Sequence, residues 1–150
     1  MKLVSTFLAL GVGISFTTST NALQLRVADA LPIDHYIAKN LISGWMNKVT
    51  EASNGEITFK YFPAGQLGKE QDMFKLVSSG AVDIAYVGVS YASDKLPLSA
   101  IGELPGSFSS SCVGSAAYWP LAKSGGILDI NEFRPNNVRM LTQMPLSPYQ

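Results

Sequence analysis

Side chains that could do chemistry are few in this sequence, and the first candidate is a serine. The stretch GVSYA, residues 88–92, follows an apolar run, as the GxSxG elbow of serine hydrolases follows a strand. That fold places its catalytic histidine after the serine, whereas the single histidine of the chain, His35, precedes Ser90. Ala92 also stands where the motif ends in glycine. The residue order argues against hydrolysis, and a secreted serine hydrolase is kept only as a distant alternative.

Phosphate, metal and acid-base chemistry find still less support. The stretch PAGQLGKE has Pro63 where a P-loop needs glycine and Glu70 where it needs serine or threonine, so AGQLG is interpreted as a rigid turn. One cysteine, Cys112, and one histidine cannot form a zinc site. No pair of carboxylates falls where the predicted strands end. We therefore expect no enzyme activity, no metal and no cofactor.

The remaining candidates are residues suited to binding a ligand. His35 and Tyr36 lie near the amino end of a predicted helix, where partial positive charge favours anions. Tyr91 offers a hydroxyl group and a flat ring, and Gly88 leaves room for a ligand to approach the backbone. Two alternatives stay open, because His35 could be an ordinary surface residue and Tyr91 could cap the core.

Segments with the two-residue period of a strand alternate along the chain with segments that have the period of a helix, which predicts how the candidate binding residues come together. Short connections between such elements favour parallel strands with right-handed crossovers, because an antiparallel meander would not need the helices. The predicted order is a strand at Leu25–Ala30, a helix capped by Asp34, a strand at Ile57–Phe62, a helix from Glu70 to Gly80, and a strand at Val82–Val89.

In an open parallel sheet, ligands bind in the crevice beyond the carboxyl ends of the strands. Those ends are the segments Ala30–Tyr36, Phe62–Gly68 and Gly88–Tyr91, and we expect them to gather at one edge. The pattern weakens after them. Residues 112–123 are expected to be helical, kinked or split at Pro120, and residues 137–142 are expected to form a short strand.

The amino end of the chain predicts export. Lys2 precedes an uncharged run of about fourteen residues, and the small residues Thr20 and Ala22 follow with the spacing that a signal peptidase accepts. A membrane anchor is the alternative, but a spanning helix needs roughly eighteen or more apolar residues. We therefore expect residues 1–22 to be a signal peptide and residues 23–150 to be an exported α/β domain with no further membrane insertion.

Charge and cysteine content narrow the partners of that domain. The chain carries eleven basic and eleven acidic residues with no run of like charge, and loss of Lys2 leaves one net negative charge. Such a surface gives no reason to expect nucleic acid or anionic lipid as a partner. A single cysteine, Cys112, cannot close an internal disulfide, so stability must come from an apolar core.

Four segments together resemble the amino-terminal part of TRAP transporter solute-binding proteins of the DctP type. They are the NGEI turn, the FPAGQLG turn, the stretch SGAVDIAY and the later LPG, and their order and spacing are specific although none is alone. The resemblance covers most of residues 25–108. It implies a periplasmic protein with two α/β lobes that close around a small organic anion and deliver it to membrane permease subunits.

The resemblance also implies which residues face the ligand. Ala30, Gly88 and Tyr91 would line the cleft, in addition to His35 from the strand-end argument. Members that bind sialic acid carry charged residues at the positions of Gly88 and Tyr91, which are uncharged here, so a smaller or more apolar carboxylate is expected.

One departure from the family affects binding. Members are roughly twice as long, with a second lobe of ordinary domain size that supplies an arginine for the substrate carboxylate, and neither Arg134 nor Arg139 matches that motif. We therefore expect a first lobe with a parallel βαβαβ core and no second lobe, which binds its ligand weakly or not at all. A solute-binding protein for an ATP-driven importer or a sensor is the alternative, because the fold does not fix the partner.

Overall fold

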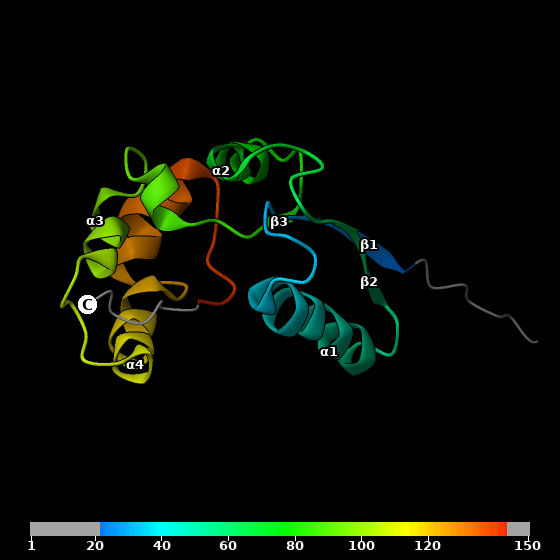
Figure 1. The fold of residues 1–150 in the computed structure, drawn as a ribbon, viewed down its shortest axis with the longest axis horizontal. Coiled ribbons are helices and arrows are strands. Elements are labelled where there is room, and N and C mark those ends of the chain that lie inside the picture. Colours follow the sequence, from blue (N-terminus) through cyan, green and yellow to red (C-terminus); the bar gives the residue numbers. More distant parts are fainter. Residues whose placement is uncertain (1–21, 144–150) are drawn as a thin grey trace, which may run out of the picture.

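The computed structural model describes residues 22–143, so all but the last residue of the expected signal peptide lies outside the described part of the chain. Within it, no helix is long and apolar enough to cross a membrane. The fold has a sheet flanked by helices in the first half and a group of short helices in the second (Figure 1). The chain runs from the sheet into the helical group after β3.

The sheet has three parallel strands, β1 (Leu23–Ala28), β2 (Ile57–Phe62) and β3 (Ile84–Ala85). Their order is β2-β1-β3, with Leu23 opposite Ile57 and Val27 opposite Ile84. The parallel arrangement predicted from the alternating periods is confirmed. The first strand begins and ends two residues earlier than predicted, so Ala30 lies just beyond it.

The first crossover begins with one π-helical segment, η1 (Ile37–Ser43), and continues as α1 (Gly44–Ala52). Its apolar stripe is buried at Ile37, Ile42 and Met46, which pack against Val27 of β1. The predicted cap was wrong. Tyr36 precedes the helix without a side-chain cap, because the backbone N–H of His35 donates to the carbonyl of Pro32 and a turn keeps Asp34 out of the capping position.

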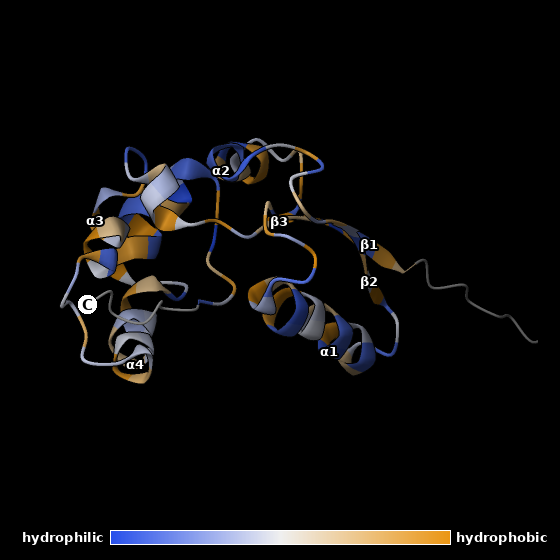
Figure 2. Ribbon diagram, in the orientation of Figure 1, coloured by the Kyte–Doolittle hydropathy of each residue, from blue (hydrophilic) through white to orange (hydrophobic). Residues whose placement is uncertain are grey.

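The second crossover is α2 (Glu70–Ser78), which begins at Glu70 as predicted and carries Glu70 and Asp72 in its first turn. The backbone N–H of Lys69 donates to Asp72 Oδ2 at 2.9 Å, which fixes the start of the helix. Met73 is fully buried against Ala28 and Val82. Both α1 and α2 carry hydrophilic and hydrophobic residues around their circumference, as amphipathic helices do (Figure 2).

The third strand is much shorter than predicted. The apolar run Val82–Val89 forms a strand only at Ile84–Ala85, and a 3₁₀ turn, η2 (Val89–Ala92), follows Gly88. An apolar run shows that a segment is buried, but the extent of a strand depends on its partner, and β1 ends at Ala28 beside Ala85. The residues Tyr86–Gly88 therefore leave the sheet and lead toward the helical group.

The second half contains short helices. They are α3 (Pro97–Ala100), η3 (Ile101–Glu103), α4 (Ser111–Ala122), the π-helical η4 (Asp129–Phe133) and the 3₁₀ turn η5 (Arg134–Asn136). The predicted helix over 112–123 is confirmed as one helix that includes Pro120. The predicted strand over residues 137–142 was wrong, because Asn137 is left-handed and no described strand pairs with the segment.

Two buried carboxylates hold the helical group together. Glu132 accepts hydrogen bonds from the backbone N–H groups of Leu98 and Ser99 and from the Ser99 hydroxyl, which ties η4 to α3. Asp129 accepts from Gly125 N–H and from Arg134, and these bonds lower the pKa of its carboxyl. Both acids therefore stabilise the helical group through hydrogen bonds to neighbouring segments.

Candidate functional site

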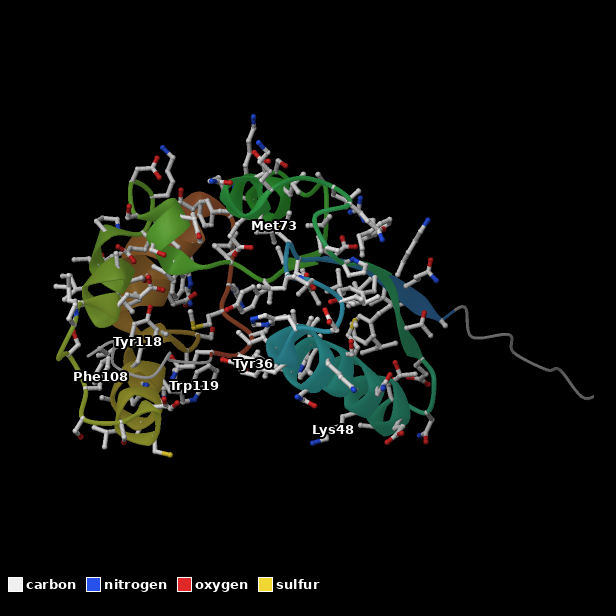
Figure 3. All side chains as sticks on the ribbon, viewed as in Figure 1. Tyr36, Lys48, Met73, Phe108, Tyr118 and Trp119 are labelled. Atoms are coloured by element: carbon white, nitrogen blue, oxygen red, sulfur yellow. The ribbon has the colours of Figure 1, made fainter. Side chains whose placement is uncertain are left out.

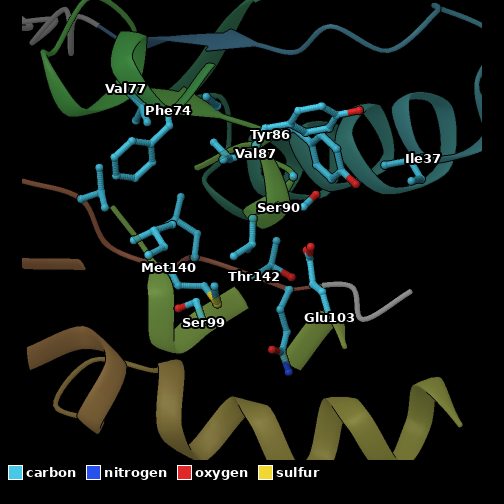
Figure 4. A pocket seen from close by; sticks show the side chains of 18 of the residues that line it. Ile37, Phe74, Val77, Tyr86, Val87, Ser90, Ser99, Glu103, Met140 and Thr142 are labelled. Carbon is cyan, nitrogen blue, oxygen red and sulfur yellow. The ribbon is translucent and has the colours of Figure 1, made fainter. Parts of the chain in front are cut away.

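A cavity of about 1100 Å³ separates the sheet from the helical group. Tyr86 and Val87 line it on the side of β3, and Met140 and Thr142 line it on the other side (Figure 4). Tyr36, ahead of η1, and Tyr118, on α4, project toward it from two different parts of the fold (Figure 3). The cavity is therefore built from segments far apart in the sequence.

The strand ends lie together, as the sheet topology predicts. Asp29 N–H donates to the carbonyl of Phe62 at 3.3 Å, and Tyr86 N–H donates to the carbonyl of Ala28 at 3.0 Å. Ala30, Phe62 and Val87 pack against the same buried cluster of Ala28, Met73 and Val82. All three strand ends therefore meet at one edge.

Three of the four predicted binding residues line this cavity: His35, Gly88 and Tyr91. Ala30 does not, because it lies on the same face of β1 as Ala28 and packs toward α2. Its neighbour Leu31 points to the other face and lines the cavity instead. Contact of these four residues with a ligand stays a prediction.

Glu70 is the cavity residue that the sequence reasoning missed. Its Oε1 accepts a hydrogen bond from Gly88 N–H at 3.1 Å, which joins the start of α2 to the segment that follows β3. A Cβ atom on Gly88 would lie 3.0 Å from the Tyr91 ring and 3.4 Å from Glu70 Oε1. Burial raises the pKa of Glu70, the Gly88 bond opposes that rise, and the nearby Asp29 adds to it.

The buried acid Asp29 connects the end of β1 to its neighbours. Asp29 is fully buried, accepts a hydrogen bond from the Tyr61 hydroxyl, and accepts another from Leu31 N–H at 2.9 Å. Its own carbonyl accepts from Gly65 N–H at 3.0 Å. The end of β1 is thus tied to β2 and to the AGQLG turn, confirming that the turn is a structural element.

The charges around the cavity are mostly negative. Glu70, Asp83 and Glu103 line it together with one arginine, Arg139, and Asp83 is already paired with Arg26 at 2.9 Å. His35 Nδ1 accepts from Ile37 N–H at 3.3 Å, which leaves Nε2 to carry the proton of the neutral ring. Donors for an anionic ligand along this lining are these two side chains, the Trp45 indole N–H, the Gln143 amide, backbone N–H groups and hydroxyls.

Aromatic rings and apolar side chains form much of the remaining wall. The rings belong to Tyr36, Trp45, Phe74, Tyr86, Tyr91, Phe108, Tyr118 and Phe133. Tyr118 Oη is buried, and burial raises the pKa of this hydroxyl against an opposing contribution from Ser99. The flat walls offer contact area to an apolar part of a ligand.

The hydrolase alternative gains nothing from the geometry. Ser90 lies in the 3₁₀ turn η2 rather than at a strand-to-helix elbow, and no hydrogen bond joins it to His35 among residues 22–143. The described residues also contain no group of three or more acidic, histidine or cysteine side chains that could hold a metal ion. The arrangement supports binding of a small molecule.

The sequence profile of the bacterial extracellular solute-binding proteins of family 7, DctP, matches residues 27–134. The chain belongs to the DctP family. A solute-binding protein of Albidiferax ferrireducens is 27% identical over an alignment of 104 residues, and the match covers 63% of this chain and 31% of that protein.

Solved DctP-like structures share the fold. A TRAP solute-binding protein from a marine metagenome, specific for aromatic acids and solved with metahydroxyphenylacetate, is 30% identical with a TM-score of 0.61, and the match covers 65% of this chain and 32% of that one. A TRAP protein of Bordetella bronchiseptica with bound mandelate is 23% identical with a TM-score of 0.63, covering 73% and 34%. This chain therefore spans about a third of the length of its relatives.

Proposed function

We propose that this chain acts in a periplasmic solute-binding protein of a TRAP-type secondary transporter, where it forms one wall of the site for a small organic acid. The observation that carries the proposal is the cavity at the carboxyl ends of three parallel strands in a DctP-family fold. His35, Gly88 and Tyr91, all expected at strand ends, lie on its wall. Export by residues 1–22 and delivery to integral membrane permease subunits complete the proposed role.

An apolar, ring-containing monocarboxylate is the ligand that the wall favours. Aromatic side chains offer flat contact area, and Glu70 and Glu103 disfavour a second ligand carboxylate. The marine metagenome relative, at 30% identity, is described as specific for aromatic acids. Backbone N–H groups, Arg139 and His35 Nε2 supply the donors that a single carboxylate needs.

The test is a titration followed by NMR, because half of a binding site is expected to bind only in the millimolar range. The ¹⁵N-labelled chain is titrated with benzoate, succinate and glucose up to about 20 mM, chosen to span the weak end of the affinity scale. We expect benzoate to shift the amide signals of Gly88, Tyr91 and their neighbours, and glucose to shift none. A folded chain whose signals respond to no organic acid would contradict the proposal.

Export has its own test. The gene is expressed in a Gram-negative host, and the periplasmic fraction is analysed by mass spectrometry. A product that begins at Leu23 is expected from cleavage after Ala22. A product that keeps Met1–Ala22 and remains in the cytoplasm would contradict the proposed location.

A further inference from the structure

Glu70 presents a difficulty for a site that receives an anion. Its side chain lines the cavity and is half-buried, yet none of the ion pairs among residues 22–143 includes it. Within the described part of the chain, the group that donates a hydrogen bond to it is a backbone group, Gly88 N–H. An acid in such a place repels the carboxylate of a ligand unless the ligand also brings a donor to it.

The position of Glu70 makes it a fixed acceptor. The bond from Gly88 N–H holds Oε1 at 3.1 Å, and the carboxyl emerges from the first turn of α2. Tyr91 borders the same spot, since an added Cβ on Gly88 would lie 3.0 Å from its ring. A carboxylate held beside an aromatic ring in a cavity wall is arranged to accept a hydrogen bond from a polar group on a flat ligand.

We propose that Glu70 is a specificity-determining residue that selects acids carrying a second, hydrogen-bond-donating group, so that the preferred ligand is a hydroxylated aromatic monocarboxylate. The inference rests on the proposed function, because it assumes that organic acids bind in this cavity. The ligand carboxylate lies away from Glu70, and its hydroxyl donates to the oxygen that Gly88 does not use. A group of the same size without a proton to donate leaves the acid unsatisfied, which is how a site discriminates against an analogue lacking a hydroxyl.

The burial of Glu70 also favours a ligand that donates a hydrogen bond to it. It raises the pKa of Glu70, with a further rise from Asp29, so the carboxylate is the costlier form in this environment. A donated hydrogen bond stabilises that form, and hydrogen bonds to charged groups are among the stronger ones. The two oxygens of the carboxyl then have one donor each.

The experiment compares three ligands of nearly equal shape on the full chain by NMR titration: 3-hydroxybenzoate, 3-methoxybenzoate and benzoate. The variants are Glu70→Gln and Glu51→Gln, the latter making the same chemical change at an exposed position of α1 outside the cavity. We expect 3-hydroxybenzoate to bind about tenfold more tightly than 3-methoxybenzoate to the unmodified chain and to Glu51→Gln, the ratio that one hydrogen bond to a partly exposed charged group produces. In Glu70→Gln the ratio is expected to fall to about one, because the amide oxygen keeps the Gly88 bond while the second carboxylate oxygen is replaced by an NH₂ group, which cannot accept a hydrogen bond from the ligand hydroxyl.

The outcomes separate the two proposals. Equal affinity for all three acids in the unmodified chain, or a preference that survives in Glu70→Gln, would overturn the role of Glu70 while leaving acid binding intact. Absence of binding by every acid to a folded chain would overturn the proposed function itself. Circular dichroism of each variant verifies folding before the ratio is taken.

Discussion

Two glycines with equally close neighbours are expected to differ in what they contribute to stability. A Cβ atom at Gly65 would lie 3.0 Å from the carbonyl oxygen of Gly68, and a Cβ atom at Gly88 would lie 3.0 Å from the ring of Tyr91. Gly65 has a φ of +70°, in the left-handed region, and its obstructing atom is backbone. Gly88 has a φ of −72°, and its obstructing atom belongs to an exposed side chain that can rotate away.

Replacement of each glycine by alanine is expected to change the free energy of unfolding by different amounts. Gly65→Ala is expected to lower the free energy of unfolding by about 1 to 2 kcal/mol, the cost of a left-handed residue with a Cβ. For a chain of about this size, where 1 kcal/mol shifts Tm by about 2 to 4 °C, that corresponds to a fall in Tm of about 2 to 8 °C. Gly88→Ala is expected to change the free energy of unfolding by less than about 0.5 kcal/mol, the usual range for an unstrained surface substitution.

The assay is urea unfolding followed by far-ultraviolet circular dichroism, with thermal melts as a second measure. Gly65 N–H donates to the Asp29 carbonyl at 3.0 Å, so strain in the turn is transmitted to the end of β1. Equal destabilisation by the two substitutions, or a neutral Gly65→Ala, would refute the reasoning. Either result would mean that the turn relaxes without cost and does not position the strand end.

Three further predictions concern charge and affinity. Arg26 lowers the pKa of Asp83 to about 2, so the ion pair stabilises the fold above the ordinary pKa of aspartate, and this stabilisation is lost as the pH falls from about 4 toward 2. Asp83→Asn is expected to lower the free energy of unfolding by at most about 1 kcal/mol at pH 7, because the pair is partly exposed. In urea unfolding, the same variant is expected to show a weaker dependence of stability on pH between about 4 and 2. Glu132→Gln removes at least one bond from a buried acceptor and is expected to cost about 1 to 3 kcal/mol by the same assay, whereas an unchanged midpoint would mean that η4 does not hold α3. Titration calorimetry of residues 23–150 with benzoate is expected to show no tight binding, and submicromolar affinity would disprove the expectation of a weak half-site.

Local patterns predicted the architecture because they depend on neighbouring residues. The strand at Ile57–Phe62 lies where predicted, and the left-handed backbone of Asn54 and Gly55 in the NGEI turn directly precedes it. Short connections between such elements then leave little choice but parallel strands. The common edge of the three strand ends follows from that topology.

Features that depend on distant partners could not be predicted. The apolar run Val82–Val89 and the segment 137–142 have strand-like composition, but a strand exists only where another strand pairs with it. Partial burial at Val138 and Met140 alternates with exposure at Arg139 and Leu141, so the two-residue period of a strand is present without a pairing partner. The composition of these segments indicates that they are partly buried, but it does not indicate whether their backbone pairs with another strand.

The candidate site was predicted in position but not in every residue. His35, Gly88 and Tyr91 line the cavity because they follow strand ends, whereas Ala30 misses it through the two-residue period of β1, which places it on the face toward α2. From the sequence, Glu70 was interpreted only as a mismatch to the P-loop motif and as the first residue of a helix. Its bond to Gly88 spans eighteen residues of sequence, and no local pattern indicates it.

The hydrogen bond between Tyr61 and Asp29, which holds the end of β1, can be tested by changing Tyr61. Its hydroxyl donates to the fully buried carboxylate of Asp29, and Tyr61→Phe removes that donor while keeping the ring. We expect a loss of about 1 to 3 kcal/mol in the free energy of unfolding at pH 7, the cost of an unsatisfied buried acceptor. Tyr36→Phe, at an exposed tyrosine, serves as the control and is expected to have little effect.

The pH dependence of the same variant distinguishes a hydrogen bond from simple packing. Burial and the bond to Asp29 raise the pKa of Tyr61 above that of a free tyrosine, so the folded chain holds a proton that the unfolded chain releases above about pH 10. Stability of the unmodified chain is therefore expected to fall as the pH rises past that value, and more steeply than stability of Tyr61→Phe. Parallel curves for the two proteins would mean that Asp29 does not depend on the Tyr61 hydroxyl, and the strand end that positions Leu31 and Glu70 would need another support.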